Sequence, residues 1–113
     1  MPELVFYVDV SAAEAANAEE MLRKANGLPG ITNADVRTEE PERSLAGIDI
    51  ASITLTLTAL SGAVASASLL LNKIQDLVKS IRGLRKVLVQ TADGPKPLES
   101  IGADDLLALL SKK

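Results

Sequence analysis

Two groups of charged side chains could do chemistry in this sequence of 113 residues, which contains no histidine and no cysteine. The first is acidic and consists of Glu39, Glu40 and Glu42, beside Pro41. Without histidine or cysteine, these carboxylates could form only a weak oxygen site for a hard cation. We therefore expect residues 39–47 to be a solvated acidic loop, with no metal site and no cofactor.

The second group is basic and consists of Lys79, Arg82, Arg85 and Lys86, in the segment KSIRGLRK. It could contact phosphate, as in nucleic acid, or an anionic membrane surface. Alternatively, its charges complement the negative C-terminal end of a preceding helix. We favour the helix interpretation because the net charge is −3 and the chain has only one phenylalanine and one tyrosine.

Catalytic motifs are missing from the sequence. It contains no P-loop, no nucleophile elbow and no GxGxxG fingerprint. The lack of histidine and cysteine also removes the commonest general base near neutral pH and the thiol nucleophile. We therefore predict that the chain is not an enzyme.

The N-terminal part has the pattern of a strand, a helix and a second strand. Residues 4–10 alternate apolar and polar positions, which predicts a strand. Ser11 is expected to open a capping box with Glu14, at the start of a helix that ends near Asn26. Residues 31–38 alternate weakly, which favours a strand at the edge of a sheet.

The C-terminal part predicts two more strands and a helix. Residues 86–91 read as a strand, followed by a turn at Asp93–Gly94. Residues 96–100 could pair back as a short fourth strand, limited by Pro95 and Pro97. Acidic residues at the start of the segment 102–110 favour a short final helix.

Between these parts, apolar residues recur at alternating spacings of three and four, which predicts a helix from Asp49 to about Ile81. Ile53, Leu55 and Leu57 also alternate with threonines, as in a strand. We favour the helix because the heptad pattern continues far beyond this window, and we expect any kink at Ser61–Gly62. The heptad positions are Ile50, Ile53, Leu57, Leu60, Val64, Ala67, Leu71, Ile74, Val78 and Ile81.

Such a helix would be longer than the diameter of its own domain. About 32 residues span roughly 48 Å at 1.5 Å per residue, whereas a domain of this size is about 35 Å across. A partner or a second copy is therefore expected to cover its N-terminal half. The predicted interface residues are Ile50, Ile53, Leu57, Leu60, Val64 and Ala67.

The uncharged run 51–71 is also long enough to span a bilayer. Its threonines and serines make it polar for a membrane span. A lone span would also separate the predicted strands onto opposite sides of the membrane. A membrane-embedded or membrane-perturbing protein is therefore the alternative to a soluble adaptor.

The chain resembles the effector-associated constant component family of bacteria in the order and type of its elements. The segments that carry the resemblance are LVFYVDV, TALSGAVASASLLLNKIQDLVKSI, RGLRK, VLVQTADG and ADDLLALL. The resemblance implies a non-catalytic component of bacterial conflict systems, encoded with effectors and NTP-dependent switch proteins. It assigns no binding residues.

Together these observations predict a single α+β domain over residues 1–113. We expect a three- to four-stranded sheet with helices on one face, including the long central helix at about residues 50–81. The expected function is a cytoplasmic adaptor that oligomerises or docks through this helix and couples a sensor to an effector. Its expected partners are an effector, a switch protein or a second copy of the chain.

Overall fold

The computed structural model describes residues 3–28, 30–43, 49–59, 67–91 and 93–111. Within them it forms five strands, three α-helices and three short 3-10 helices. The strands are β1 (Glu3–Ser11), β2 (Ile31–Arg43), β3 (Asp49–Ala59), β4 (Leu84–Thr91) and β5 (Gly94–Pro97), and the α-helices are α1 (Ala15–Arg23), α2 (Ala67–Lys79) and α3 (Ala103–Ser111). The 3-10 helices are Ala12–Glu14, Lys24–Gly27 and Leu98–Ser100.

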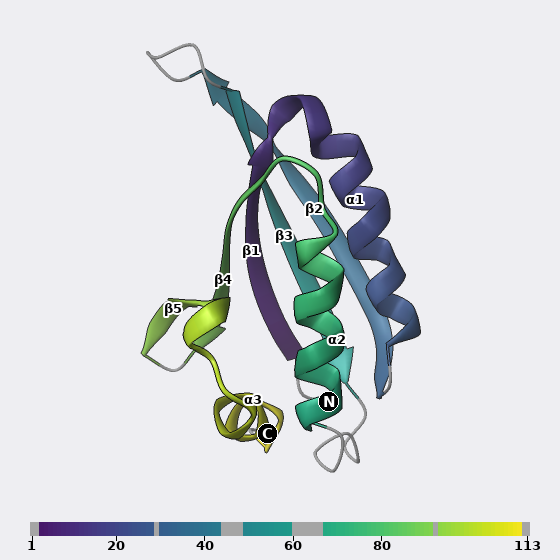
Figure 1. Cartoon of the computed structure of the whole chain (residues 1–113), viewed down its shortest axis with the longest axis vertical. Helices are drawn as coiled ribbons and strands as arrows, with labels where there is room; N and C mark the ends of the chain where they lie inside the picture. Colours follow the sequence, from purple (N-terminus) through teal and green to yellow (C-terminus); the bar gives the residue numbers. More distant parts are fainter. Residues whose placement is uncertain (1–2, 29, 44–48, 60–66, 92, 112–113) are drawn as a thin grey trace.

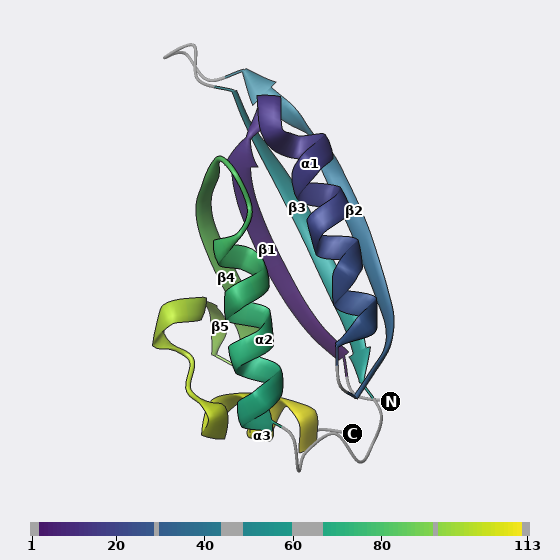
Figure 2. The same ribbon diagram turned by 45° about the vertical axis from the view of Figure 1, so that its right-hand side comes forward.

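The five strands form one antiparallel sheet in the order β2-β3-β1-β4-β5. Helices α1 and α2 lie side by side on one face of this sheet, and α3 packs beneath α2 (Figures 1 and 2). The succession β-α-β-β-α-β with this strand order is the split β-α-β arrangement called ferredoxin-like. Strand β5 and helix α3, which follow β4 in the chain, are additions to this arrangement.

Strand β1 is the centre of the sheet, and its alternating pattern explains why. Leu4, Phe6, Val8 and Val10 are at most 1% exposed and face the helices. The residues between them lie on the opposite face, which neither α1 nor α2 covers (Figure 2). The predicted strand is confirmed. The predicted capping box does not form, because the side chain of Ser11 makes no capping hydrogen bond.

The predicted long helix is wrong, and strand β3 occupies its first third. Ile53, Leu55 and Leu57 pair with β1 and are at most 1% exposed. A spacing of four places Ile53 and Leu57 on the same side of a strand as well as of a helix. The spacing of three between Ile50 and Ile53 distinguishes a strand from a helix. Residues three apart lie on opposite faces of a strand but on the same face of a helix. Ile50 is 37% exposed and Ile53 is 1% exposed, as a strand requires.

The last third of the predicted helix is helical. In α2, which has 13 residues, Leu71, Ile74 and Val78 are at most 6% exposed and pack into the core. The heptad pattern is therefore made of two unrelated parts, an alternating strand and an amphipathic helix. Residues 60–66, which include Leu60, Val64 and the expected kink at Ser61–Gly62, lie outside the described part of the chain.

Two other predictions about this region need correction. The expected loop at residues 39–47 is wrong at its start, because β2 continues to Arg43 and pairs there with Asp49 of β3. The bilayer span at residues 51–71, the alternative to a soluble adaptor, begins in the sheet instead, since β3 reaches Ala59. No described helix is both long and apolar enough to cross a membrane. The edge position predicted for the second strand is confirmed.

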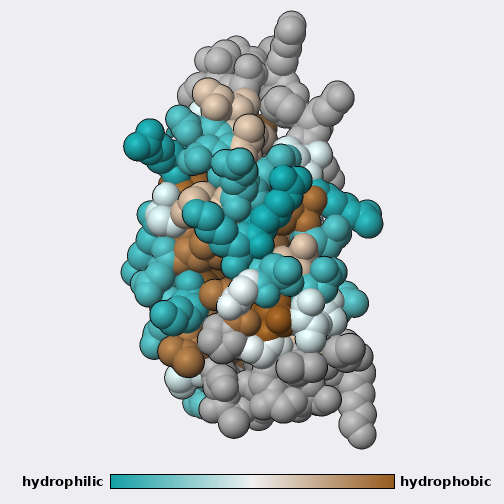
Figure 3. All heavy atoms as spheres, turned by 90° about the vertical axis from the view of Figure 1, so that its right-hand side faces the viewer, coloured by the Kyte–Doolittle hydropathy of each residue, from teal (hydrophilic) through white to brown (hydrophobic). Residues whose placement is uncertain are grey.

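Hydrophilic side chains dominate the side of the molecule formed by α1 and β2, with hydrophobic atoms visible between them (Figure 3). Partly buried residues of these elements pack against the core from this side, among them Met21 of α1 and Val36 of β2. The edge of the sheet at β2 is thus mostly polar at the surface.

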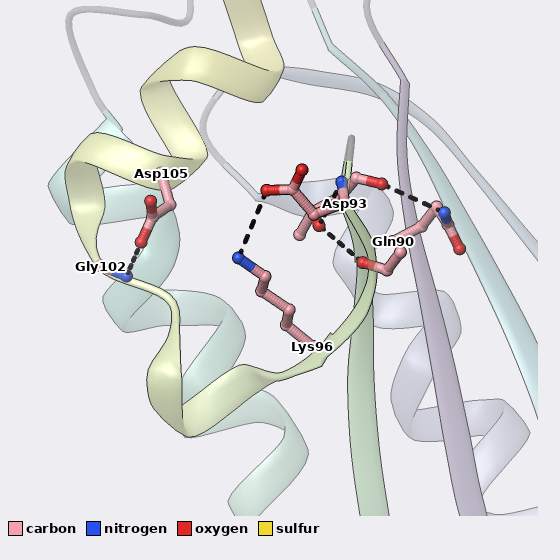
Figure 4. A network of polar contacts seen from close by, with 7 residues as sticks. Gln90, Asp93, Lys96, Gly102 and Asp105 are labelled. Atoms are coloured by element: carbon pink, nitrogen blue, oxygen red, sulfur yellow. Dashed lines mark hydrogen bonds and ion pairs between the residues drawn. The ribbon is translucent and has the colours of Figure 1, made fainter.

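Strand β5 is four residues long, shorter and earlier than the predicted strand 96–100. A compact polar network holds its turn to β4 (Figure 4). The Thr91 hydroxyl donates to the carbonyl of Gly94 at 2.6 Å, and the Asp93 amide donates to Thr91 Oγ1 at 3.2 Å. Lys96 forms an ion pair with Asp93 at 3.6 Å.

The start of α3 is fixed in the same region. The Gly102 amide donates to Asp105 Oδ2 at 3.0 Å, the reciprocal half of a capping box (Figure 4). The predicted final helix is confirmed at Ala103–Ser111. Strand β5 ends at Pro97, because the 3-10 helix Leu98–Ser100 follows it directly, and so β5 covers only part of β4.

Candidate functional site: a basic groove at the edge of the sheet

The candidate site lies where strand β4 is longer than its neighbour β5. Strand β5 pairs only with Leu88–Thr91, the second half of β4. On its other side, β4 pairs with β1 from Leu84 to Val89. Residues 84–87 therefore form the outer edge of the sheet, where β4 continues beyond β5 (Figure 1).

This exposed edge borders a groove of about 660 Å³ between β4, the C-terminal half of α2 and the 3-10 helix Leu98–Ser100. We call it the basic edge groove. Its lining residues are Gln75, Val78, Lys79, Leu84, Arg85, Lys86, Val87, Pro97, Leu98 and Glu99.

The groove has an apolar floor. Val78 of α2 is 4% exposed and Leu98 is 5% exposed, and both belong to the core. Leu84 and Val87 of β4 are partly buried and pack against the same core. A side chain that entered the groove would therefore meet aliphatic carbon, and its burial would contribute favourably to binding.

Cationic side chains surround this floor. Lys79, Arg85 and Lys86 are exposed, while Glu99 is the single acidic residue of the lining. None of the three cations forms an ion pair within the described part of the chain. The groove therefore carries a net positive charge, in a protein whose net charge is −3.

Three of the four residues predicted to contact an anion meet at this groove. Lys79 comes from α2, and Arg85 and Lys86 come from β4. Arg82 lies in the turn between these elements and does not line the groove. The competing interpretation, a complement to the dipole of a helix end, fits Lys79 in the last turn of α2. Arg85 and Lys86 belong to a strand, so that interpretation does not account for them.

The predicted interface residues that the structure describes in β3 do not form a common surface. Ile53 and Leu57 are buried in the chain's own core, so they are not accessible to a partner in this fold. Ile50 is partly exposed at the start of β3. Leu60 and Val64 lie outside the described residues, and Ala67 begins α2. The helical seam that motivated this interface is absent.

Two smaller depressions lie elsewhere. One, of about 490 Å³, lies on the face of the sheet away from the helices, around Thr54, Thr56 and Thr58 of β3. Asp35 and Arg37 beside it already pair with each other at 3.1 Å. The other, of about 150 Å³, lies between β5 and α3. Within the described residues, no three acidic side chains are placed to hold a metal ion.

No sequence pattern directly marked Val87 and Leu98 as parts of a site. One signal for them was available in Pro95 and Pro97, which were expected to keep the last strand short. A short last strand leaves part of the preceding strand without a partner strand. The residues that follow the short strand then border this unpaired part. The groove itself depends on how α2 lies over β4, which no local pattern encodes.

Fold and groove together define a small α+β domain with an uncovered, basic stretch of sheet edge. Ferredoxin-like domains serve many unrelated functions, so the fold alone indicates none. No protein-family model matches the chain, and no curated protein matches it. The resemblance to the effector-associated constant component family therefore stays a prediction.

Proposed function

We propose that this chain is a non-catalytic adaptor that binds an acidic segment of a protein partner in the basic edge groove. One observation carries the proposal: Lys79, Arg85 and Lys86, from two elements, all line one groove with an apolar floor. Apolar contact contributes binding free energy, and the cations attract the carboxylates of an acidic segment.

The setting of this adaptor is suggested by the resemblance to components of bacterial conflict systems. In that setting the partner is an effector or an NTP-dependent switch protein in the cytoplasm, and the adaptor couples a sensor to the effector. The non-catalytic part of the proposal rests on a sequence without histidine or cysteine. The predicted route of docking changes from a helical seam to the edge groove.

Fluorescence anisotropy with the full chain and a short labelled peptide of alternating glutamate and valine tests this proposal. We expect saturable binding that weakens as salt is added, because exposed charges are screened. The variant Arg85→Gln/Lys86→Gln should bind between about twofold and about thirtyfold more weakly, from two exposed charge pairs. The matched control is Arg23→Gln/Lys73→Gln, which removes equal charge from exposed helix positions outside the groove.

Three outcomes would contradict the proposal. The first is equal binding by the two double variants. The second is tighter binding of anionic lipid vesicles or a single-stranded oligonucleotide than of the peptide. The third is a concentration-dependent dimer, seen by light scattering, that the groove variant alone abolishes. In that case the groove binds a second copy of the chain.

A further inference from the structure

We infer that the segment bound in the basic edge groove is extended and joins the five-stranded sheet as an additional strand, paired with β4 at Val87. This inference rests on the proposed function and names the form of its partner.

The prolines of β5 determine which way the backbone groups of β4 point. Pro95 and Pro97 have no N–H group, so neither can donate a hydrogen bond to β4. Lys96 lies between them and is paired with Val89. Hydrogen-bonded pairs alternate with non-bonded pairs in an antiparallel ladder. Val89, and by the same alternation Thr91, must therefore exchange hydrogen bonds with β5.

The same alternation extends to the uncovered part of β4. The N–H and C=O groups of Val87 point outward, in the same direction as those of Val89, while those of Leu88 point toward Tyr7 of β1. Strand β5 ends before it reaches Val87. Val87 thus presents one donor and one acceptor at the edge, side by side, for an incoming strand.

The groove has the geometry that strand addition requires. Successive side chains of a strand point to opposite faces, so every second residue of an added strand would face the helices. There it would meet Val78 and Leu98, the apolar floor. The residues between would lie on the other face, beside Lys86, which lies opposite Asp9 of β1 in the strand register. Main-chain pairing with side-chain pockets at alternate positions is how β-augmentation combines affinity with specificity.

Charge determines which strand fits. Basic side chains on an edge are a common protection against pairing between identical edges. Arg85 and Lys86 would oppose the same residues of a second copy aligned along β4, and so disfavour that arrangement. An acidic strand would instead meet them with opposite charge. The other edges of the sheet are less suited to an added strand, because β5 carries two prolines and β2 carries Pro41, and proline has no N–H group to donate.

Amide hydrogen exchange on the full chain, followed by NMR, tests this inference. On saturation with the alternating glutamate–valine peptide, exchange of the Val87 amide should slow by at least about tenfold, as expected for one new hydrogen bond. The Leu88 amide is the internal control. It already faces β1, so its exchange should change less than that of Val87.

Two N-methylated forms of the peptide provide an independent measurement. Each form carries methyl groups on one alternate set of amides. We expect one form to bind at least about tenfold more weakly and the other to bind nearly as well as the parent, since only one set faces β4.

Failures of the two proposals are distinguishable. If the parent peptide binds but the Val87 amide exchanges as before, strand addition is wrong and the adaptor proposal stands. Equal affinities of the two methylated forms would lead to the same conclusion. If the parent peptide does not bind at all, the proposed function fails, and strand addition of an acidic segment fails with it.

Discussion

Gly83 lies between α2 and β4, and its backbone conformation and surroundings both favour glycine. Its φ is +73°, a left-handed conformation that residues with a side chain rarely adopt. Its carbonyl accepts a hydrogen bond from the Ser11 amide at 2.9 Å. A Cβ atom there would lie 3.0 Å from Glu14 Cγ and 3.1 Å from Ser11 Cβ. Both conformation and space therefore require glycine.

We predict that Gly83→Ala lowers the free energy of unfolding by about 1–3 kcal/mol, from left-handed strain and crowding. Gly27→Ala is the control, because a Cβ there meets nothing within 4 Å and its φ is not positive. We expect it to change the free energy of unfolding by no more than about 1 kcal/mol. Urea denaturation of both variants measures the difference, and equal stabilities would contradict this account of the turn.

At the scale of elements, β3 is the segment whose secondary structure decides the fold. Leu57 is fully buried, while Thr56 beside it is half-buried on the opposite face. In a long helix with an exposed N-terminal half, Leu57 would be a surface residue. In the observed strand it is part of the core that α1 and α2 cover.

We predict that Leu57→Ala lowers the free energy of unfolding by about 2–5 kcal/mol, as for a fully buried leucine. Thr56→Ala should cost about 1 kcal/mol or less, the span of strand propensities. Chemical denaturation monitored by circular dichroism compares the two. A second variant extends the comparison: Leu57→Asp should fail to fold, and a folded Leu57→Asp protein would contradict the burial of Leu57 in the core.

At the scale of the whole molecule, strand order determines how stability is distributed. Strand β1 lies between β3 and β4 and contributes four core side chains that are at most 1% exposed. Strand β5 lies at the end of the sheet and has four residues, two of them prolines. Elements with few neighbours open locally at lower free energy than the centre of a core.

We therefore predict that the amides of β1 exchange only when the whole domain unfolds, and that Lys96 in β5 exchanges at least about tenfold faster. Hydrogen exchange followed by NMR on the free chain measures both. If Lys96 and Phe6 exchange at the same rate, β5 is part of the cooperative core, and the edge of β4 is less accessible than we infer.

The sequence by itself determined the elements whose patterns are local. The alternation of Leu4, Phe6 and Val8 gave the central strand, and Leu71, Ile74 and Val78 marked the inner face of a helix. The basic cluster was recognised from composition, and three of its members line one groove. These features depend on residues near one another in the chain, so periodicity and charge reveal them.

Only the tertiary structure decided between strand and helix at residues 49–59. Spacings of four fit both, and the strand prevails because β1 and β2 pair with β3 along both of its edges. Such pairing joins residues far apart in sequence, so a local pattern cannot contain it. The groove has the same origin. It exists because β5 stops short of Val87 while α2 lies across β4, and both depend on how the chain folds back on itself.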